Sequence, residues 1–195
     1  MDTQQQFFSI THPFKVSVNA LDTSSHDQVP DDQAFENMMP QSFRLAAQMS
    51  TLDTNALRPL KGLGEHAGDL SDFINIQAKK IDLMMSYILT LDEGNRARLD
   101  GTSFGGSHLT FLSKEAFKED QLVTVKVFID EGNCAIFAIA RIIASETTTN
   151  GDFNVNAMFV KINEEAQEQL VRTSLHVQTM QLKERSEARR LTDTD

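Results

Sequence analysis

The sequence is short of the residues on which several classes of protein depend. It has one cysteine, Cys134, among 195 residues, so it can form no internal disulfide and has no cysteine-based metal cluster. Its five histidines, at 12, 26, 66, 108 and 176, lack the spacing of metal sites. No apolar run reaches the roughly 20 residues of a membrane span, and no segment is typical of a signal peptide. We therefore expect a cytoplasmic protein without a metal or membrane insertion.

Positive charge is also scarce. The chain has 18 Lys and Arg against 28 Asp and Glu, which gives a net charge of −10, and residues 1–14 contain no Lys or Arg. Because nucleic-acid binding depends on clustered basic side chains, this balance argues against DNA or RNA as a partner. It also disfavours a dianionic ligand, which would need a local group of cations.

The patterns of common catalytic sites are missing as well. Phosphate-binding loops place glycines between a strand and a helix, whereas Gly105-Gly106 leads into a strand pattern. Ser103 and His108 share one hairpin, but no acid or oxyanion hole accompanies them, as nucleophilic catalysis would require. Cys134 lies in an apolar run, where a cysteine serves as a small buried hydrophobe. We predict a protein that is not an enzyme and uses no cofactor.

The second half of the sequence does contain clear strand patterns. Apolar residues make up 40% of the chain, enough for a packed core, and the segment 130–133 (Asp-Glu-Gly-Asn) has the composition of a tight hairpin turn. Short antiparallel strands joined by such turns are typical of a meander or a small closed barrel. The predicted strands are residues 7–18, with Pro13 interrupting the ladder, and 96–101, 108–112, 122–129, 134–143 and 153–160, and a helix is expected from about residue 163.

The stretch from Leu99 to Leu112 is the centre of this pattern. It reads Leu-Asp-Gly-Thr-Ser-Phe-Gly-Gly-Ser-His-Leu-Thr-Phe-Leu, with an apolar approach that ends at Gly101 and a glycine pair before the next strand. Glycines between two alternating runs predict a tight connection, because glycine enters positive φ without a steric penalty. On these residues alone, two readings stay open: a simple β-hairpin corner, or a loop that holds a ligand.

An Asp/Asn-x-Ser-x-x-Gly pattern at a strand–turn–strand, followed by a small barrel and a helix, resembles the PilZ domain family. The likeness covers residues 7–18 and 95–190. It implies an α+β fold built on a six-stranded antiparallel β-barrel with a C-terminal helix, and a bacterial signalling role without catalysis. It also implies cyclic-di-GMP as a ligand, held by the motif and an upstream Arg-x-x-x-Arg segment. Pilus assembly, flagellar motility and matrix secretion are all processes that the family regulates.

The motif departs from the family pattern in two places. Ser103 and Gly106 occupy the serine and final glycine positions, but Gly101 stands first, with Asp100 one residue early, and the expected arginines at the chain start are absent. A missing Asp or Asn removes a side-chain acceptor. The resemblance therefore implies a degenerate ligand site in which other arginines would have to substitute. Its candidate residues are Arg96, Arg98, Asp100, Gly101, Ser103, Gly106 and Arg141.

Between the first strand and the motif, the sequence carries an insertion with helical periodicity. Apolar residues at intervals of three and four predict a helix over 33–57, with Asp31 or Asp32 as N-cap and a kink or restart near Pro40. A second helix is predicted over 68–92, with an apolar heptad seam. The seam residues are Leu70, Ile74, Gln77, Ile81, Met84, Ile88 and Leu91. Internal packing and association with a second chain both remain open as cover for this seam.

The predicted organisation has three parts. Residues 1–20 hold the first barrel strand, 21–94 the helical hairpin or coiled-coil insertion, and 95–195 the rest of the barrel and the C-terminal helix. We expect the last helix to close one end of the barrel with its apolar residues. These residues are Ala166, Leu170, Val171, Leu175, Val177, Met180 and Leu182.

Two functions are compatible with this organisation. One is an adaptor with a decayed ligand site, which forms a homo-oligomer or binds a partner protein through helices 33–57 and 68–92. The other is a cyclic-di-GMP receptor that binds its ligand at the Ser103–Gly106 turn. The departures at Gly101 and at the chain start favour the adaptor.

Overall fold

A computed structural model describes residues 9–21, 29–46, 98–131 and 134–192, and ten positions between 73 and 88. The chain divides into two compact units, one formed by Met1–Pro30 with Ala97–Asp195 and the other by Asp31–Arg96. Among the described residues, no helix is long and apolar enough to cross a membrane.

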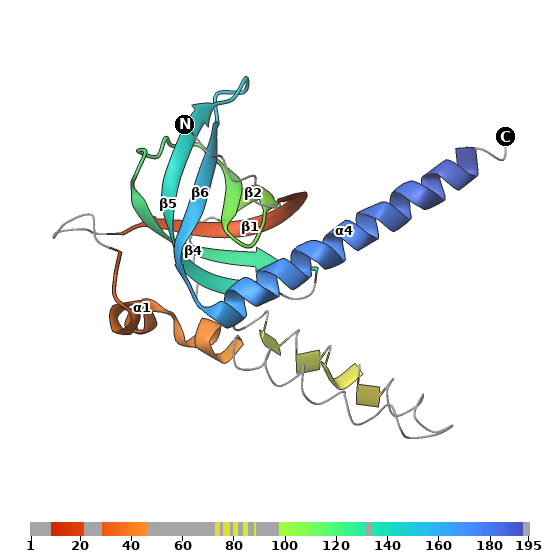
Figure 1. Cartoon of the computed structure of the whole chain (residues 1–195), viewed down its shortest axis with the longest axis horizontal. Coiled ribbons are helices and arrows are strands. Elements are labelled where there is room, and N and C mark those ends of the chain that lie inside the picture. Colours follow the sequence, from red (N-terminus) through yellow and green to blue (C-terminus); the bar gives the residue numbers. More distant parts are fainter. Residues whose placement is uncertain are drawn as a thin grey trace, which may run out of the picture. The chain divides into compact units, whose positions relative to one another are not determined.

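Six antiparallel strands close into a barrel in the first unit, in the order β1-β2-β3-β6-β5-β4 (Figure 1). Strand β1 pairs with both β2 and β4, and this double pairing closes the barrel without a free sheet edge. The predicted six-stranded barrel and the α+β class are confirmed. The strands are β1 (Ile10–Ala20), β2 (Leu99–Phe104), β3 (His108–Ser113), β4 (Leu122–Ile129), β5 (Cys134–Thr147) and β6 (Phe153–Ile162).

The inside of the barrel is filled by apolar side chains, because alternate residues of a strand point to the same face. In β4, Val123, Val125 and Val127 are fully buried. At the end where β1 begins, Phe14 meets Phe104 edge to face with ring centroids 5.5 Å apart, an arrangement that adds to the stabilisation from burial alone. The predicted role of Cys134 as a buried hydrophobe is confirmed, since it belongs to this core.

Two sequence expectations concern irregular strands. The register of β1 against β2 shifts between Thr11 and Phe14, as predicted from Pro13, which has no N–H to donate to a ladder. The predicted end of the second strand at Gly101 is wrong, because β2 continues to Phe104. Gly101 therefore lies inside a strand, and the tight connection is confined to residues 105–107.

Helix α4 (Glu164–Thr192) follows the last strand, where the carbonyl of Asn163 accepts a hydrogen bond from the Gln167 N–H. Ala166, Leu170 and Val177 belong to the barrel core, so α4 closes one end of the barrel, as predicted. Only some of the apolar residues expected on this helix are covered by the barrel, however. Successive helical residues are about 100° apart, and four of the seven apolar residues lie outside the face that the barrel covers. The exposed residues are Val171, Leu175, Met180 and Leu182.

The second unit begins with α1 (Asp32–Met38). The carboxylate of Asp31 accepts a hydrogen bond from the Ala34 N–H at 2.8 Å, which confirms it as the N-cap. Helical structure stops before Pro40 and resumes over 41–46, so the predicted restart is confirmed. The rest of the predicted helix 33–57 lies outside the described residues. The described positions between 73 and 88 are all helical.

Candidate functional site

The turn between β2 and β3 carries the serine and glycine positions of the motif. The Gly105 N–H donates to the His108 carbonyl at 3.0 Å, and the Phe159 N–H donates to the Ser107 carbonyl at 2.8 Å. The first bond closes the hairpin and the second ties it to β6. Ser103 pairs with Thr11 on one side and Thr110 on the other. The turn is therefore held by backbone hydrogen bonds on both sides.

Gly101, at the first motif position, lies directly against the ring of Phe14. The two residues pair across β1 and β2, and a Cβ atom at Gly101 would run into the Phe14 ring. An Asp or Asn has no room there while Phe14 keeps its place in the core. The departure from the family pattern thus has a packing cause: only a residue without a side chain allows this close approach.

Gly106, at the last motif position, contacts helix α4. A Cβ atom at Gly106 would lie 2.8 Å from Cγ2 of Val171, closer than real Cβ contacts allow. The Gln167 side-chain amide donates a hydrogen bond to the Gly106 carbonyl at 3.0 Å. A second amide, that of Gln181, donates to the Thr11 carbonyl at 2.9 Å. The turn is accordingly one of the points at which α4 docks on the barrel.

The structure does not bring the predicted arginines to this turn. The Arg98 guanidinium lies 4.1 Å from the centroid of the Phe128 ring, beyond the opposite end of β2. Arg141 is on β5, separated from β3 by β6, and its Nη1 donates to the Asp120 carbonyl at 3.4 Å. Arg96 lies outside the described residues. Neither Arg98 nor Arg141 is thus placed to share a phosphate with Ser103.

His108 is the titratable residue beside the turn. Its Nδ1 lies 3.3 Å from the Ser107 hydroxyl, and burial lowers the pKa of its imidazole from the ordinary 6.5 because a charged ring is poorly solvated there. The ring is therefore neutral at pH 7. It adds no positive charge with which the turn would attract an anion.

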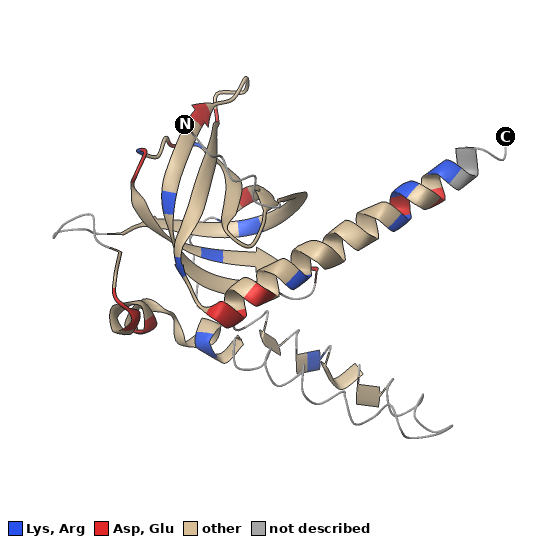
Figure 2. Ribbon diagram, in the orientation of Figure 1, with Lys and Arg blue, Asp and Glu red and all other residues tan. Residues whose placement is uncertain are grey.

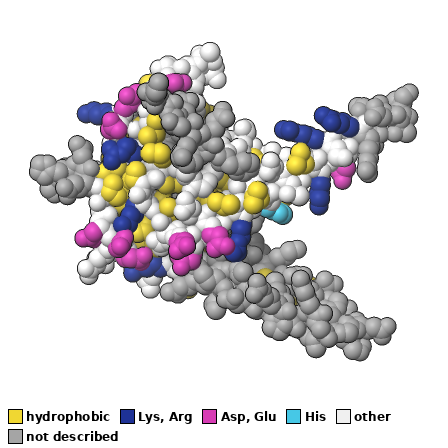
Figure 3. All heavy atoms as spheres, in the orientation of Figure 1, with side chains coloured by type: hydrophobic (Ala, Val, Ile, Leu, Met, Phe, Trp, Pro, Cys, Tyr) yellow, Lys and Arg dark blue, Asp and Glu magenta, His cyan; other side chains and the backbone are white. Residues whose placement is uncertain are grey.

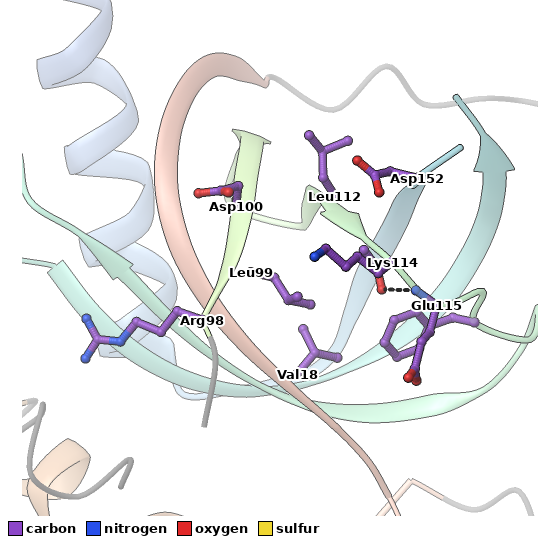
Figure 4. A pocket seen from close by; sticks show the side chains of 10 residues that line it. Val18, Arg98, Leu99, Asp100, Leu112, Lys114, Glu115 and Asp152 are labelled. Atoms are coloured by element: carbon purple, nitrogen blue, oxygen red, sulfur yellow. Dashed lines mark hydrogen bonds between the residues drawn. The ribbon is translucent and has the colours of Figure 1, made fainter. Parts of the chain in front are cut away.

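A cavity of about 550 Å³ opens at the other end of the barrel from α4 (Figure 4). Lys114 extends into it, whereas the Arg98 guanidinium points away (Figure 4). Asp100, also at its edge, forms an exposed ion pair with Lys15 at 2.5 Å. The lining residues are Val18, Arg98, Leu99, Asp100, Leu112, Ser113, Lys114, Glu115, Phe117 and Asp152.

The cavity has the volume of a small-ligand site but not the charge of a phosphate site. Asp100, Glu115 and Asp152 line the cavity together with Lys114, which extends into it, and phosphate recognition relies on paired guanidinium groups. Of the predicted ligand residues, Arg98 and Asp100 line this cavity, whereas Ser103 and Gly106 lie at the turn between β2 and β3. Within the described part of the chain, no group of His, Cys, Asp or Glu is suited to hold a metal ion.

No protein-family model matches this sequence, and no curated protein matches it. A solved structure does: a pathogenic PilZ domain protein of Xanthomonas campestris superposes with a TM-score of 0.51, over 91% of this chain and 90% of its own, at 16% identity. The chain has the PilZ fold. The Xanthomonas protein is a tetramer that self-assembles through an unusual helical bundle. The Bacillus subtilis inhibitor of motility MotI/DgrA aligns over 43% of this chain and 42% of its own at 10% identity, with a TM-score of 0.39.

In this PilZ barrel, both glycine positions of the motif serve packing. Sequence reasoning identified the turn and missed Phe14 and Gln167, which occupy the space around it. The role of Phe14 could have been recognised in the sequence, because Phe14 is a large aromatic residue beside a strand irregularity. An aromatic residue opposite a glycine on the neighbouring strand is a recognised cross-strand pair. Gln167 had none, because its role depends on where α4 meets the turn.

Proposed function

We propose that this chain is a PilZ-type adaptor that acts in the cytoplasm through protein–protein contacts, without catalysis, and that it self-associates through its inserted helices. The observation that carries this proposal is the exposed apolar seam of the second unit. Ile81, Met84 and Ile88 are 47%, 66% and 38% exposed, although they recur at heptad spacing. A contiguous exposed apolar row marks an interaction surface rather than a solvated face.

Two further observations support self-association. Gln77, next to Ile74 in the same seam, is polar, and a polar residue at one seam position often fixes register and oligomer state. Leu70 and Leu91 lie outside the described residues. The Xanthomonas protein, whose tetramer is held by a helical bundle, aligns with 91% of this chain. That alignment is too long to be confined to the barrel.

The geometry of the turn supports a role that does not depend on cyclic-di-GMP. Phe14 fills the space of the first motif side chain, and Val171 and Gln167 occupy the last motif position. We propose that the PilZ barrel is kept as a scaffold, and that signalling passes through contacts of the helices. The partner is a second copy of the chain or another protein that presents an apolar helix.

The seam predicts a clear effect of Ile81→Asp. A charge in the middle of an apolar interface loses its hydration without gaining a partner, so the variant should break the seam contact and lower the mass measured by light scattering below that of the wild-type oligomer. Lys80→Asp is the matched control, because it places the same side chain on the neighbouring exposed position and should leave the mass unchanged. Two results would refute the proposal. One is a wild-type protein that is monomeric at roughly tens of micromolar, a concentration at which a weak association is already visible. The other is an Ile81→Asp variant that keeps the mass of the wild-type oligomer.

Calorimetric titration with cyclic-di-GMP is expected to give no binding heat. Neither Arg98 nor Arg141 reaches the turn, and the overall charge of −10 opposes a dianion. Micromolar binding that is lost in both Arg98→Ala and Ser103→Ala, but kept in Arg185→Ala on α4, would instead support the receptor function. That result would overturn the proposal of a decayed site.

A further inference from the structure

Helix α4 presents a second apolar stripe, which lies outside the buried core of the barrel. Val171, Leu175 and Leu182 are 42%, 51% and 57% exposed. They lie roughly 120° around the helix from the buried residues Leu170 and Val177, given about 100° per residue. Hydrophobic side chains are visible along this part of α4, between the barrel and the basic end of the helix (Figure 3).

The stripe belongs to a longer heptad row. Starting at Glu164, positions spaced alternately by four and three residues all fall on one face of α4, the pattern of a coiled-coil seam. The row is acidic at its start, apolar in the middle and basic at its end. Its members are Glu164, Glu168, Val171, Leu175, Gln178, Leu182, Arg185 and Arg189.

The charges of the row are arranged end to end along the helix. Glu164 and Glu168 lie in its first turns and Arg185 and Arg189 near its end. Figure 2 shows acidic residues at the start of α4 and basic residues among those toward its end. The row is symmetric about a midpoint between His176 and Val177. A second copy in the opposite direction would therefore place every acidic position opposite a basic one.

We propose that α4 pairs with α4 of a second copy as an antiparallel coiled coil. In this register Val171 faces Leu182 of the partner subunit, and Leu175 faces Gln178 of the partner subunit. Glu168 then meets Arg185 of the partner subunit, and Glu164 meets Arg189 of the partner subunit. Each of these layers joins an a to a d position, as antiparallel packing requires. The charged pairs flank the apolar centre at both ends.

Charge also selects the orientation. A parallel pair would set Glu168 against Glu168 and Arg185 against Arg185, and like charges at facing positions are destabilising. The antiparallel pair removes both repulsions and aligns the two helix dipoles favourably. Val171 of the stripe also lies beside Gly106, but no residue of the stripe belongs to the barrel core, so pairing leaves that core intact.

This contact is independent of the seam in helix 68–92 and goes beyond the proposed function. The proposed α4 contact is two-fold, with the same patch on both copies. Loss of the seam alone should therefore leave a dimer paired through α4.

The decisive experiment is a charge swap. The basic variant carries Glu164→Arg and Glu168→Arg, and the acidic variant carries Arg185→Glu and Arg189→Glu; all four side chains are exposed. Both are made in the Ile81→Asp background, which isolates the α4 contact from the seam. By sedimentation velocity at low salt, each variant alone should be monomeric, because its row has one sign of charge. An equimolar mixture should restore the dimer, because the two rows are then complementary at every position.

The mixture separates this inference from the proposed function. Two results would overturn α4 pairing. One is an Ile81→Asp protein, without the charge swaps, that is monomeric at about 100 µM. The other is a mixture of the two charge variants that stays monomeric although circular dichroism shows both chains folded. The seam is judged separately, by comparing the mass of the wild-type protein with that of the Ile81→Asp variant: a fall in mass supports the seam whether the variant is left as a dimer or as a monomer. Restored pairing that weakens as salt is raised supports the proposal, because exposed charges are screened.

Crosslinking tests the orientation directly. With Glu168→Cys and Arg185→Cys together, a short bis-maleimide should link two antiparallel copies, whereas Glu168→Cys alone should not. The two copies of residue 168 would then be about 26 Å apart along the axis. Cys134 is 1% exposed and burial raises the pKa of its thiol to about 12, so it should not react. Dimers from Glu168→Cys alone would show a parallel pair and refute the proposal.

Discussion

Gly101→Asp, the change that completes the PilZ motif, is expected to destabilise the barrel strongly instead of creating a ligand site. The new side chain would run into the Phe14 ring, and its carboxylate would be buried in the core. Overpacking costs about 1–3 kcal/mol, and burial of an unpaired charge adds to it. We expect a loss of roughly 3–5 kcal/mol in the free energy of unfolding, measured by urea denaturation.

A double-mutant cycle identifies Phe14 as the cause. Gly101→Ala alone should cost about 1–3 kcal/mol, as an added methyl group does in a packed core. In a Phe14→Leu background, where the ring atoms that it meets are gone, the same change should cost less than half as much. An equal cost in both backgrounds would show that Phe14 does not exclude a side chain at Gly101, and the packing account of the motif would fail.

Leu170→Ala is expected to have the other large effect, because it removes the anchor of α4. Leu170 is fully buried and belongs to the barrel core. Truncation of such a leucine costs about 2–5 kcal/mol through lost burial and the cavity left behind. Urea unfolding should report this loss, and hydrogen exchange of the α4 amides should become faster.

The same helix offers a matched control. Leu175 is five residues further along and lies on the exposed stripe. For a protein dilute enough to be monomeric, Leu175→Ala should change the free energy of unfolding by no more than about 0.5 kcal/mol. If the two variants were equally destabilised, the division of α4 into a barrel face and a free face would be wrong.

Local features of the protein were determined by the sequence alone. The strand patterns, the irregularity at Pro13, the Asp31 N-cap and the restart after Pro40 each depend on residues a few positions apart. Alternation and capping act over such distances whatever the rest of the chain does. The resemblance of the Leu99–Leu112 stretch to the PilZ motif led to the barrel for the same reason, since it is a strand–turn–strand pattern read in one window.

The tertiary structure decided what these elements do to one another. That Gly101 is needed for Phe14, and Gly106 for α4, depends on contacts across β1 and from the end of the chain, which no local window contains. The position of the barrel against α4 likewise decided which of seven apolar residues are buried and which form a free stripe. Helical spacing shows which residues share a face, but what covers that face is set by non-local packing.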